Sequence, residues 1–393
     1  MEQQAQAKFS EKSRLVGFES AKLSPLGYTP LSAVRVRTDA VVRADPQFLS
    51  DLVKRWAASS TVSTELDGES VKIIAVNKSE VLVDSQYRPL QLSTEHLNHS
   101  VLQELAQPHQ SRASLLYVGE WMPSEPAGSQ SAVPVLALTG QWEKALTFSA
   151  PQVHLLGFDG EQQELTHVFA TERGGQWVSA RVLAEHCNNE SPTTADSAQE
   201  DTQQWAQLAS IAAALNNWHA SASFDPRTGE PTFVTHSGWS RTTAQGRELF
   251  PRTDPAVITA VTAEFDNEQK ILLGQARAWG KQRYSTFAGF VEAGESIENA
   301  VCRELYEECG AQVETLQYLG SQPWPFPRSL MLGFTAQISN PQSVVADGEE
   351  IETIRWFTRG ELVSAHRSGE IQLPGASSIS RMLIENFLGT PLS

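Results

Sequence analysis

The sequence predicts an α+β protein of several domains: a β-rich N-terminal domain, a linker region and a C-terminal α/β layered domain. At roughly 100–200 residues per domain, a chain of 393 residues is too long for one domain. Hydrophobic residues make up 40% of it and charged residues 19%, a globular mixture that excludes a disordered or fibrous chain. Near residue 250, short strands give way to strands with intervening helices. We therefore expect domains at 1–170 and 251–393, joined by a linker at 171–250.

Charge, apolar runs and cysteines restrict the classes of partner and location. The net charge of −16 disfavours broad binding to nucleic acid or anionic lipid. The longest apolar runs fall far short of the ~20 residues that a membrane helix needs, and the N-terminus lacks the apolar core of a secretory signal. The three cysteines are unpatterned, so no disulfide framework is expected. We expect a cytoplasmic protein with no membrane partner.

Short β-rich segments dominate the first 170 residues. Strands are expected at Val71–Val76, Val81–Val83, Val133–Leu138 and Val153–Phe158. One helix is expected at Pro46–Ala58, where apolar residues recur at helical spacing. No catalytic constellation is visible in this region, so we expect a structural or dimer-forming domain.

The linker region combines a polar segment with one helix. Cys187–Gln204 contains almost nothing to bury and is expected to be a solvated loop. Trp205–Trp218 is rich in alanine and has apolar residues at helical spacing, which predicts a helix. A polar, turn-rich stretch follows.

The C-terminal region alternates between strands and helices. A hairpin with its turn at Asp266–Asn267, two further strands and two helices are expected at Ala256–Phe265, Ile271–Leu273, Leu330–Ile338, Ile354–Phe357, Ser296–Cys309 and Ile379–Leu388. Gly310 is expected to end the first of these helices. This mixture is typical of a layered α/β domain.

Three glutamates gather on one face of the helix expected at 296–309. Glu304 and Glu308 are four residues apart, and Glu307 flanks the same face. Converging carboxylates repel one another unless a cation lies among them, and Mg²⁺ prefers oxygen ligands. Arg303 lies four residues before Glu307 and can brace it. An ordinary amphipathic helix with an acidic solvent face would show the same pattern, so the helix alone does not decide.

The residues around this helix favour the metal site. They match Gly-x5-Glu-x7-Arg-Glu-U-x-Glu-Glu-x-Gly-U, where U is aliphatic, from Gly289 to Ala311, and only the small Ala311 is weak. The segment resembles the Nudix box, and Nudix hydrolases cleave a nucleoside diphosphate linked to another group. The resemblance implies Mg²⁺ or Mn²⁺ held by a loop–helix–loop within an α/β/α sandwich. The catalytic residues that it implies are Glu295, Arg303, Glu304, Glu307 and Glu308.

A second motif follows the box. Ser321–Ser329 is SQPWPFPRS, and its three prolines predict a stiff loop. Trp324 and Phe326 offer flat faces on which a planar ring could stack, although a buried aromatic turn would look the same. The segment looks like the signature of NADH pyrophosphatases, a Nudix subfamily. That subfamily cleaves NAD(H) to nicotinamide mononucleotide and AMP, and it also removes NAD caps from RNA 5′ ends.

The subfamily resemblance covers roughly residues 150–393 and implies further site residues. Metal ligands are implied at the Ala288 carbonyl, Glu304, Glu308 and Glu350. Substrate contacts are implied at Arg181, Phe250, Gln322, Pro323, Trp324, Pro325, Phe326, Pro327, Arg328, Ser329 and Ser380. The general base is left open between the box glutamates and Glu350. A homodimer is implied by the resemblance alone.

The linker departs from the subfamily pattern. The subfamily often carries a zinc ribbon built from two Cys-x-x-Cys pairs, but no cysteine lies between Cys187 and Cys302. Tetrahedral zinc needs about four ligands, and only His219 and His236 are available there. We therefore expect a zinc-ribbon-like segment that lacks its cysteines and binds no structural zinc. His219 is expected to cap a helix or lie on the surface.

The leading hypothesis is a metal-dependent NAD(H) diphosphatase, with NAD-capped RNA as a further substrate. Metal ions would neutralise charge on the diphosphate and activate a water. A catalytically silent dinucleotide sensor is the alternative. The missing cysteines support that alternative, and the intact carboxylate set argues against it.

Overall fold

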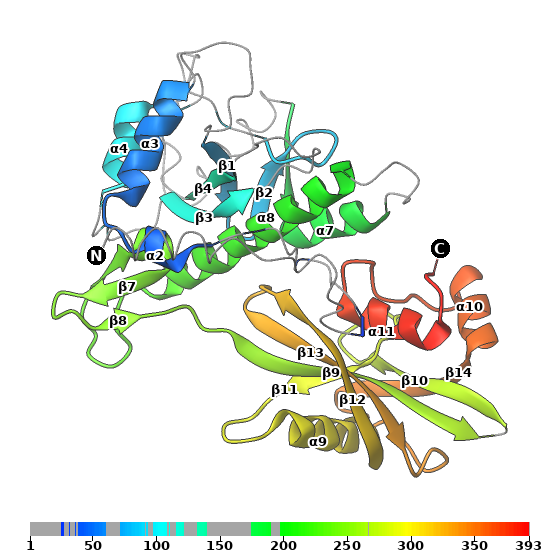
Figure 1. Ribbon diagram of the computed structural model, residues 1–393. Coiled ribbons are helices and arrows are strands. Elements are labelled where there is room, and N and C mark those ends of the chain that lie inside the picture. Colours follow the sequence, from blue (N-terminus) through cyan, green and yellow to red (C-terminus); the bar gives the residue numbers. More distant parts are fainter. Residues whose placement is uncertain are drawn as a thin grey trace, which may run out of the picture.

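The computed structural model describes most of the chain. The described residues are 38–59, 71–90, 97–107, 115–121, 132–139, 174–189, 197–265 and 267–392, with Pro25, Leu26, Leu31, Val36, Leu92 and Gln110. The helices and strands form an N-terminal unit, a small three-stranded sheet and a C-terminal unit (Figure 1). Among the helices in these ranges, none is long and apolar enough to cross a membrane.

The N-terminal unit is a five-stranded sheet with helices on both faces. Its strand order is β3-β4-β1-β2-β5. These strands span Lys72–Asn77 (β1), Glu80–Val83 (β2), Leu115–Trp121 (β3), Val133–Thr139 (β4) and Gln176–Ser179 (β5). The helices span Ala40–Arg43 (α2), Phe48–Ser59 (α3), His99–Leu105 (α4), Ala180–Asn189 (α7) and Ser197–Ser221 (α8).

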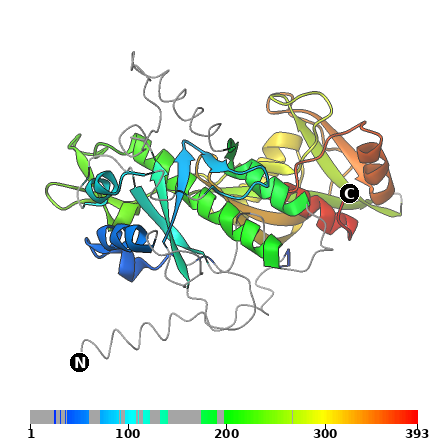
Figure 2. The ribbon, with the colours of Figure 1, turned by 90° about the horizontal axis from the view of Figure 1, so that it is seen from above.

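Burial on both faces explains the continuous apolar runs of these strands. Ile73 and Ala75 pack against α3 and α4, whereas Ile74 and Val76 face α7 and α8, because successive side chains on a strand point to opposite faces. Figure 2 shows α7 and α8 side by side next to this sheet. We call the apolar cluster on the α7–α8 face the second N-terminal core.

Most predictions for this unit are confirmed. Helix α3 and strands β1, β2 and β4 lie where the sequence placed a helix and three strands. The strand predicted at Val153–Phe158 falls outside the described residues. The loop predicted for Cys187–Gln204 is wrong at both ends, because α7 runs to Asn189 and α8 begins at Ser197. Once the apolar middle of α8 packs, the costly nucleation step is complete and each added residue gains one hydrogen bond for fixing one residue, so the helix extends into polar sequence.

The linker folds into a sheet of three short strands. β6 (Thr232–Thr235), β7 (Ser240–Thr243) and β8 (Glu248–Leu249) pair in that order, with a 3₁₀ turn at His236–Gly238. Arg241 is 1% exposed, and its guanidinium donates to Thr232 and to His219 Nδ1 at 3.1 Å. Buried hydrogen bonds therefore link this sheet to the end of α8.

His219 is part of this buried arrangement, so of its two predicted positions the one on the surface is wrong. It is 5% exposed, and its Nε2 lies 2.7 Å from the Gly238 carbonyl. A carbonyl only accepts and a guanidinium only donates, so Nε2 carries the proton and Nδ1 accepts. Burial, together with the Arg241 charge, lowers the pKa of His219 to about 4. The histidine is held in its neutral form.

The C-terminal unit has an α/β/α arrangement. Its sheet runs β12-β13-β9-β10-β14, and β11 pairs with β9. The strands span Asp254–Phe265 (β9), Glu268–Ala276 (β10), Phe287–Phe290 (β11), Val313–Trp324 (β12), Ser329–Ile338 (β13) and Ile351–Thr358 (β14). Helix α9 (Ile297–Cys309) covers one face, and α10 (Arg359–Arg367) and α11 (Ile379–Leu388) cover the other.

The predicted hairpin, strands and helices of this unit are confirmed, although Asp266 in the hairpin turn lies outside the described residues. The loop predicted for SQPWPFPRS is wrong in extent. Its first four residues complete β12, Ser329 begins β13, and Trp324 pairs with Ser329 across a short turn. β12 is the edge strand of the sheet, where a proline is tolerated because its missing N–H need not face a partner.

Candidate functional site

Helix α9 presents the predicted carboxylates at the edge of the core. Its first turn is capped by Ser296 Oγ, which accepts from the Asn299 N–H, and Gly310 ends it in the left-handed conformation at φ 68°. Val301 and Leu305 are buried against the sheet. This packing fixes the rotation of the helix, so the glutamates face the end of β11 and the loop before β14.

Arg303 holds the box together. Its guanidinium binds Glu295 through two parallel hydrogen bonds of 2.9 Å, and it donates to Glu304 and Glu307 at 2.9 and 3.0 Å. The remaining N–H donates to the Phe290 carbonyl at 2.9 Å. All five donors of the guanidinium are thus used. The hydrogen bonds from Arg303 also lower the pKa of Glu295.

Glu308 is a buried carboxylate without compensation. It is 5% exposed, and its Oε2 atom has no hydrogen-bond partner in the described part of the chain. Burial raises its pKa to about 8, and the nearby charges of Glu304, Glu350 and Asp347 act in the same direction. Burying an anion without a partner is costly. A bound cation would remove that cost.

Gly289 brings backbone into contact with Glu304. A Cβ atom at this position would lie 1.9 Å from Glu304 Cδ, so only glycine permits the approach. Ala288, whose carbonyl was predicted to meet the metal, directly precedes it on β11. Strand β11 therefore reaches the Glu304 carboxylate.

Glu350 lies on a loop that is fastened to the end of α9. The Asp347 N–H donates to the Glu308 carbonyl at 3.1 Å, and the Asp347 carboxylate accepts from the Glu350 and Ile351 N–H groups. Asp347 was not among the predicted site residues, although the Asp-Gly pair at 347–348 is a turn signal that could have marked it. This turn brings the charge of Glu350 near Glu304 and Glu308.

These surroundings fit a hard divalent cation. Within the described ranges, no three histidine, cysteine, aspartate or glutamate side chains are already gathered as a metal site, and Glu304 is occupied by Arg303. The unpaired oxygen of Glu308 and the Glu304 carboxylate, which lies against Gly289, nevertheless provide oxygen atoms of the type that Mg²⁺ and Mn²⁺ prefer.

The aromatic side chains of SQPWPFPRS face the N-terminal unit. The Trp324 and Phe326 rings lie 5.2 Å apart, edge to face, and both are half-buried against the second N-terminal core. The Arg181 guanidinium, on α7, lies 5.7 Å from the centre of the Trp324 ring. The structure thus brings these three predicted substrate contacts together. Their packing favours a role in shaping the loop.

Other predicted substrate contacts are arranged differently. Gln322 and Ser380 are buried. The Gln322 side chain forms hydrogen bonds with the backbone of Ser377 and Ile379. The Ser380 hydroxyl forms hydrogen bonds with the hydroxyls of Ser285 and Thr286. Their side chains therefore support the fold around the site. Phe250 is 59% exposed, and Arg328 pairs with Asp254 at 2.7 Å. Pro323 and Ser329 are half-buried strand residues, whereas Pro325 is buried and Pro327 exposed in the turn.

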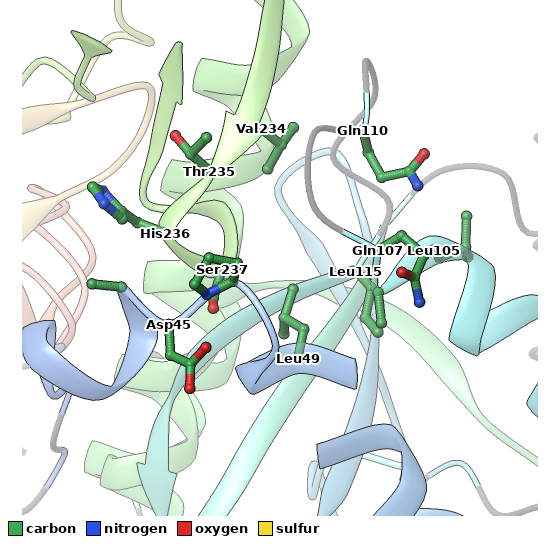
Figure 3. A pocket seen from close by; sticks show the side chains of 13 residues that line it. Asp45, Leu49, Leu105, Gln107, Gln110, Leu115, Val234, Thr235, His236 and Ser237 are labelled. Atoms are coloured by element: carbon green, nitrogen blue, oxygen red, sulfur yellow. The ribbon is translucent and has the colours of Figure 1, made fainter. Parts of the chain in front are cut away.

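A cavity of about 140 Å³ lies apart from these residues, between the N-terminal unit and the three-stranded sheet. Figure 3 shows its lining, which includes Leu49, Leu105, Leu115 and the turn at His236. None of the predicted site residues lines it. The cavity is therefore separate from the carboxylates of α9 and from the SQPWPFPRS segment.

Comparison with known proteins agrees with this geometry. Residues 254–374 match the family model described as NUDIX domain. This region of the chain is a Nudix domain. Helix α9, Gly289 and the Glu350 loop all lie inside the matched residues, and the divalent metals that Nudix hydrolases generally use suit the carboxylates found there.

Three relatives extend the similarity beyond the Nudix domain. NAD-capped RNA hydrolase NudC of Mycobacterium bovis (strain BCG / Pasteur 1173P2) is 45% identical over 190 residues, 46% of this chain and 60% of the relative. NAD-capped RNA hydrolase NUDT12 of Homo sapiens is 34% identical over 183 residues, 44% and 39% of the two chains. NAD-capped RNA hydrolase NudC of Pseudomonas aeruginosa (strain LESB58) is 42% identical over 143 residues, which are 36% of this chain and 47% of the relative. The predicted resemblance is confirmed, although the match spans at most 60% of these curated relatives.

Proposed function

We propose that the protein hydrolyses the diphosphate bond of NAD(H) to nicotinamide mononucleotide and AMP with a divalent metal ion, and that it also removes NAD caps from RNA 5′ ends. The observation that carries this proposal is the buried, unpaired Glu308 carboxylate beside Glu304 and the Glu350 loop, inside a Nudix domain. The names of the relatives, NAD-capped RNA hydrolase, support the substrate.

The box residues divide the work between binding and orientation. Glu304, Glu308, Glu350 and the Ala288 carbonyl would hold Mg²⁺ or Mn²⁺, which lowers the pKa of a bound water and neutralises charge on the diphosphate. Arg303 keeps the carboxylates in position through its four hydrogen bonds to Glu295, Glu304 and Glu307. One of Glu304, Glu307, Glu308 or Glu350 takes the proton of the attacking water.

Substrate contacts come from both units. Arg181, near Trp324, would bind an anionic part of the substrate, and the exposed Phe250 ring offers a surface for a base. The linker would keep a zinc-ribbon-like shape without metal, through His219 and Arg241. A Nudix domain that begins near residue 251, a homodimer and a cytoplasmic location belong to the same proposal.

Product identification tests the proposal. The full chain is incubated with NADH and either Mg²⁺ or Mn²⁺, and the expected products are the reduced mononucleotide and AMP in equal amounts. NAD-capped RNA should yield 5′-monophosphate RNA. A chelator should abolish turnover while circular dichroism stays unchanged. NADH that binds but is not cleaved with either metal would instead identify a silent dinucleotide sensor.

A further inference from the structure

Glu185 is a charged residue for which the proposed reaction has no direct use. It lies one helical turn after Arg181 on α7, and its Oε1 accepts from Arg181 Nε at 3.1 Å. The Arg181 side chain is 42% exposed. Among the described residues, the bond to Nε is the only hydrogen bond of this guanidinium. Glu185 thus fixes the plane of the guanidinium and leaves its two Nη groups for another acceptor.

The same carboxylate contacts the C-terminal unit. Ser377 Oγ, 192 residues away in sequence, donates to Glu185 Oε1 at 3.1 Å. The neighbouring Gly375 accommodates this contact, because a Cβ there would lie 2.6 Å from Glu185 Oε1. Glu185 therefore couples the position of the loop before α11 to the position of Arg181.

A closed set of contacts leads back to Arg181. The Ser377 carbonyl accepts from Gln322 Nε2 at 2.8 Å, and Gln322 Oε1 accepts from the Ile379 N–H at 2.8 Å. Two residues beyond Gln322 on β12 lies Trp324, whose ring faces the Arg181 guanidinium at 5.7 Å. That distance is within the range of a cation–π contact. Arg181 is thus held from one side by Glu185 and from the other by the Trp324 ring.

We propose that Glu185 is a positioning residue that aims the free edge of Arg181 at a phosphate group of the substrate, a step that rests on the proposed function. Guanidinium Nη pairs bind phosphate in a forked geometry, so their orientation decides how much of the interaction is realised. Glu185 touches no reacting atom. It acts on substrate affinity through Arg181.

The experiment is a double-mutant cycle on the full chain with NADH and Mg²⁺. Glu185→Ala is expected to raise KM about three- to tenfold and leave kcat within twofold. In an Arg181→Ala background the same change should raise KM by less than a further factor of two. Glu185→Gln keeps an acceptor oxygen, so its KM should stay within threefold of the wild-type value. Glu385→Ala, which breaks another i,i+4 pair with Arg381 on α11, is the matched control and should leave KM unchanged.

Three outcomes overturn the proposal. If Glu185→Ala raises KM equally with and without Arg181, Glu185 does not act through Arg181. If it lowers kcat and the melting temperature together, Glu185 is only a structural contact between the two units. Wild-type protein that neither binds nor cleaves NADH would refute the proposed function instead. The pair is then judged by the rise in melting temperature that inorganic pyrophosphate causes: a loss on Glu185→Ala that disappears in the Arg181→Ala background supports the positioning role, and the same loss in both backgrounds refutes it.

Discussion

Replacing Gly289 by alanine tests how closely β11 must approach the Glu304 carboxylate. The added Cβ would lie 1.9 Å from Cδ and 2.0 and 2.2 Å from the two oxygens. Ordinary van der Waals contact begins near 3.4 Å, so the carboxylate has to move by about 1.5 Å, the difference between 3.4 and 1.9 Å. The backbone itself tolerates alanine, because Gly289 has no positive φ.

The movement should affect catalysis far more than stability. It removes the 2.9 Å hydrogen bond from Arg303 to Glu304 and displaces an expected metal ligand. A misplacement of about 1 Å at a reacting centre costs roughly 10²-fold in rate, so kcat is expected to fall by about that factor or more. Glu304 is a long side chain that can swing towards solvent. The melting temperature should therefore change by only a few degrees, roughly a 1 kcal/mol effect.

The assay is steady-state hydrolysis of NADH with saturating Mg²⁺, combined with thermal unfolding of the same samples. Gly280→Ala is the matched control, since a Cβ there meets nothing within 4 Å and its φ is not positive. The control should keep wild-type kcat. A Gly289→Ala enzyme within threefold of wild type would show that the close contact is not needed, and would refute the reasoning.

Three further predictions concern other parts of the molecule. Glu308→Gln should lower kcat by at least about 10²-fold with the fold intact, because it removes an anionic ligand from a site that is buried and otherwise uncompensated; near-normal turnover at saturating metal would contradict this. His219 has its pKa lowered from 6.5 to about 4 in the folded chain. Below pH 6.5 the unfolded chain therefore takes up a proton that the folded chain excludes. The free energy of unfolding should fall between pH 6.5 and 4 by about 3 kcal/mol, and urea titrations should show a smaller fall for His219→Gln; matching pH profiles would rule the mechanism out. Trp324→Ala should lower kcat/KM for NADH and for ADP-ribose in parallel, because the ring packs against the second N-terminal core; a loss confined to NADH would show that the ring contacts the nicotinamide directly.

The box was predictable from sequence because its geometry is local. Residues three and four apart share a helical face wherever the helix lies, so the grouping of Glu304 and Glu308, and the link from Arg303 to Glu307, followed from spacing alone. The burial of Glu308 could not be predicted from this spacing, because it depends on the loop at Asp347 and on the packing of α9 against the sheet.

Polar residues that are buried in pairs were not predictable, for a related reason. Arg241 and His219 are residue types that usually lie on the surface, and their burial is explained by the hydrogen bond between them, 22 residues apart, together with their bonds to Thr232 and to the Gly238 carbonyl. The contact between Glu185 and Ser377 spans 192 residues. No periodicity or motif in one sequence carries that information.

The packing of Trp324 and Phe326 has a consequence for how this chain can be divided. A Nudix domain is usually thought of as a part that can be moved between proteins, and the family match at 254–374 suggests where one would cut. Here such a cut would remove the second N-terminal core, against which Trp324 and Phe326 pack, and would expose both large apolar side chains to water. The fragment would tend to aggregate, and its SQPWPFPRS segment would lose the contacts that hold its shape. The smallest transferable part of this protein therefore includes the N-terminal unit, whose sheet and helices α7 and α8 together build the second N-terminal core.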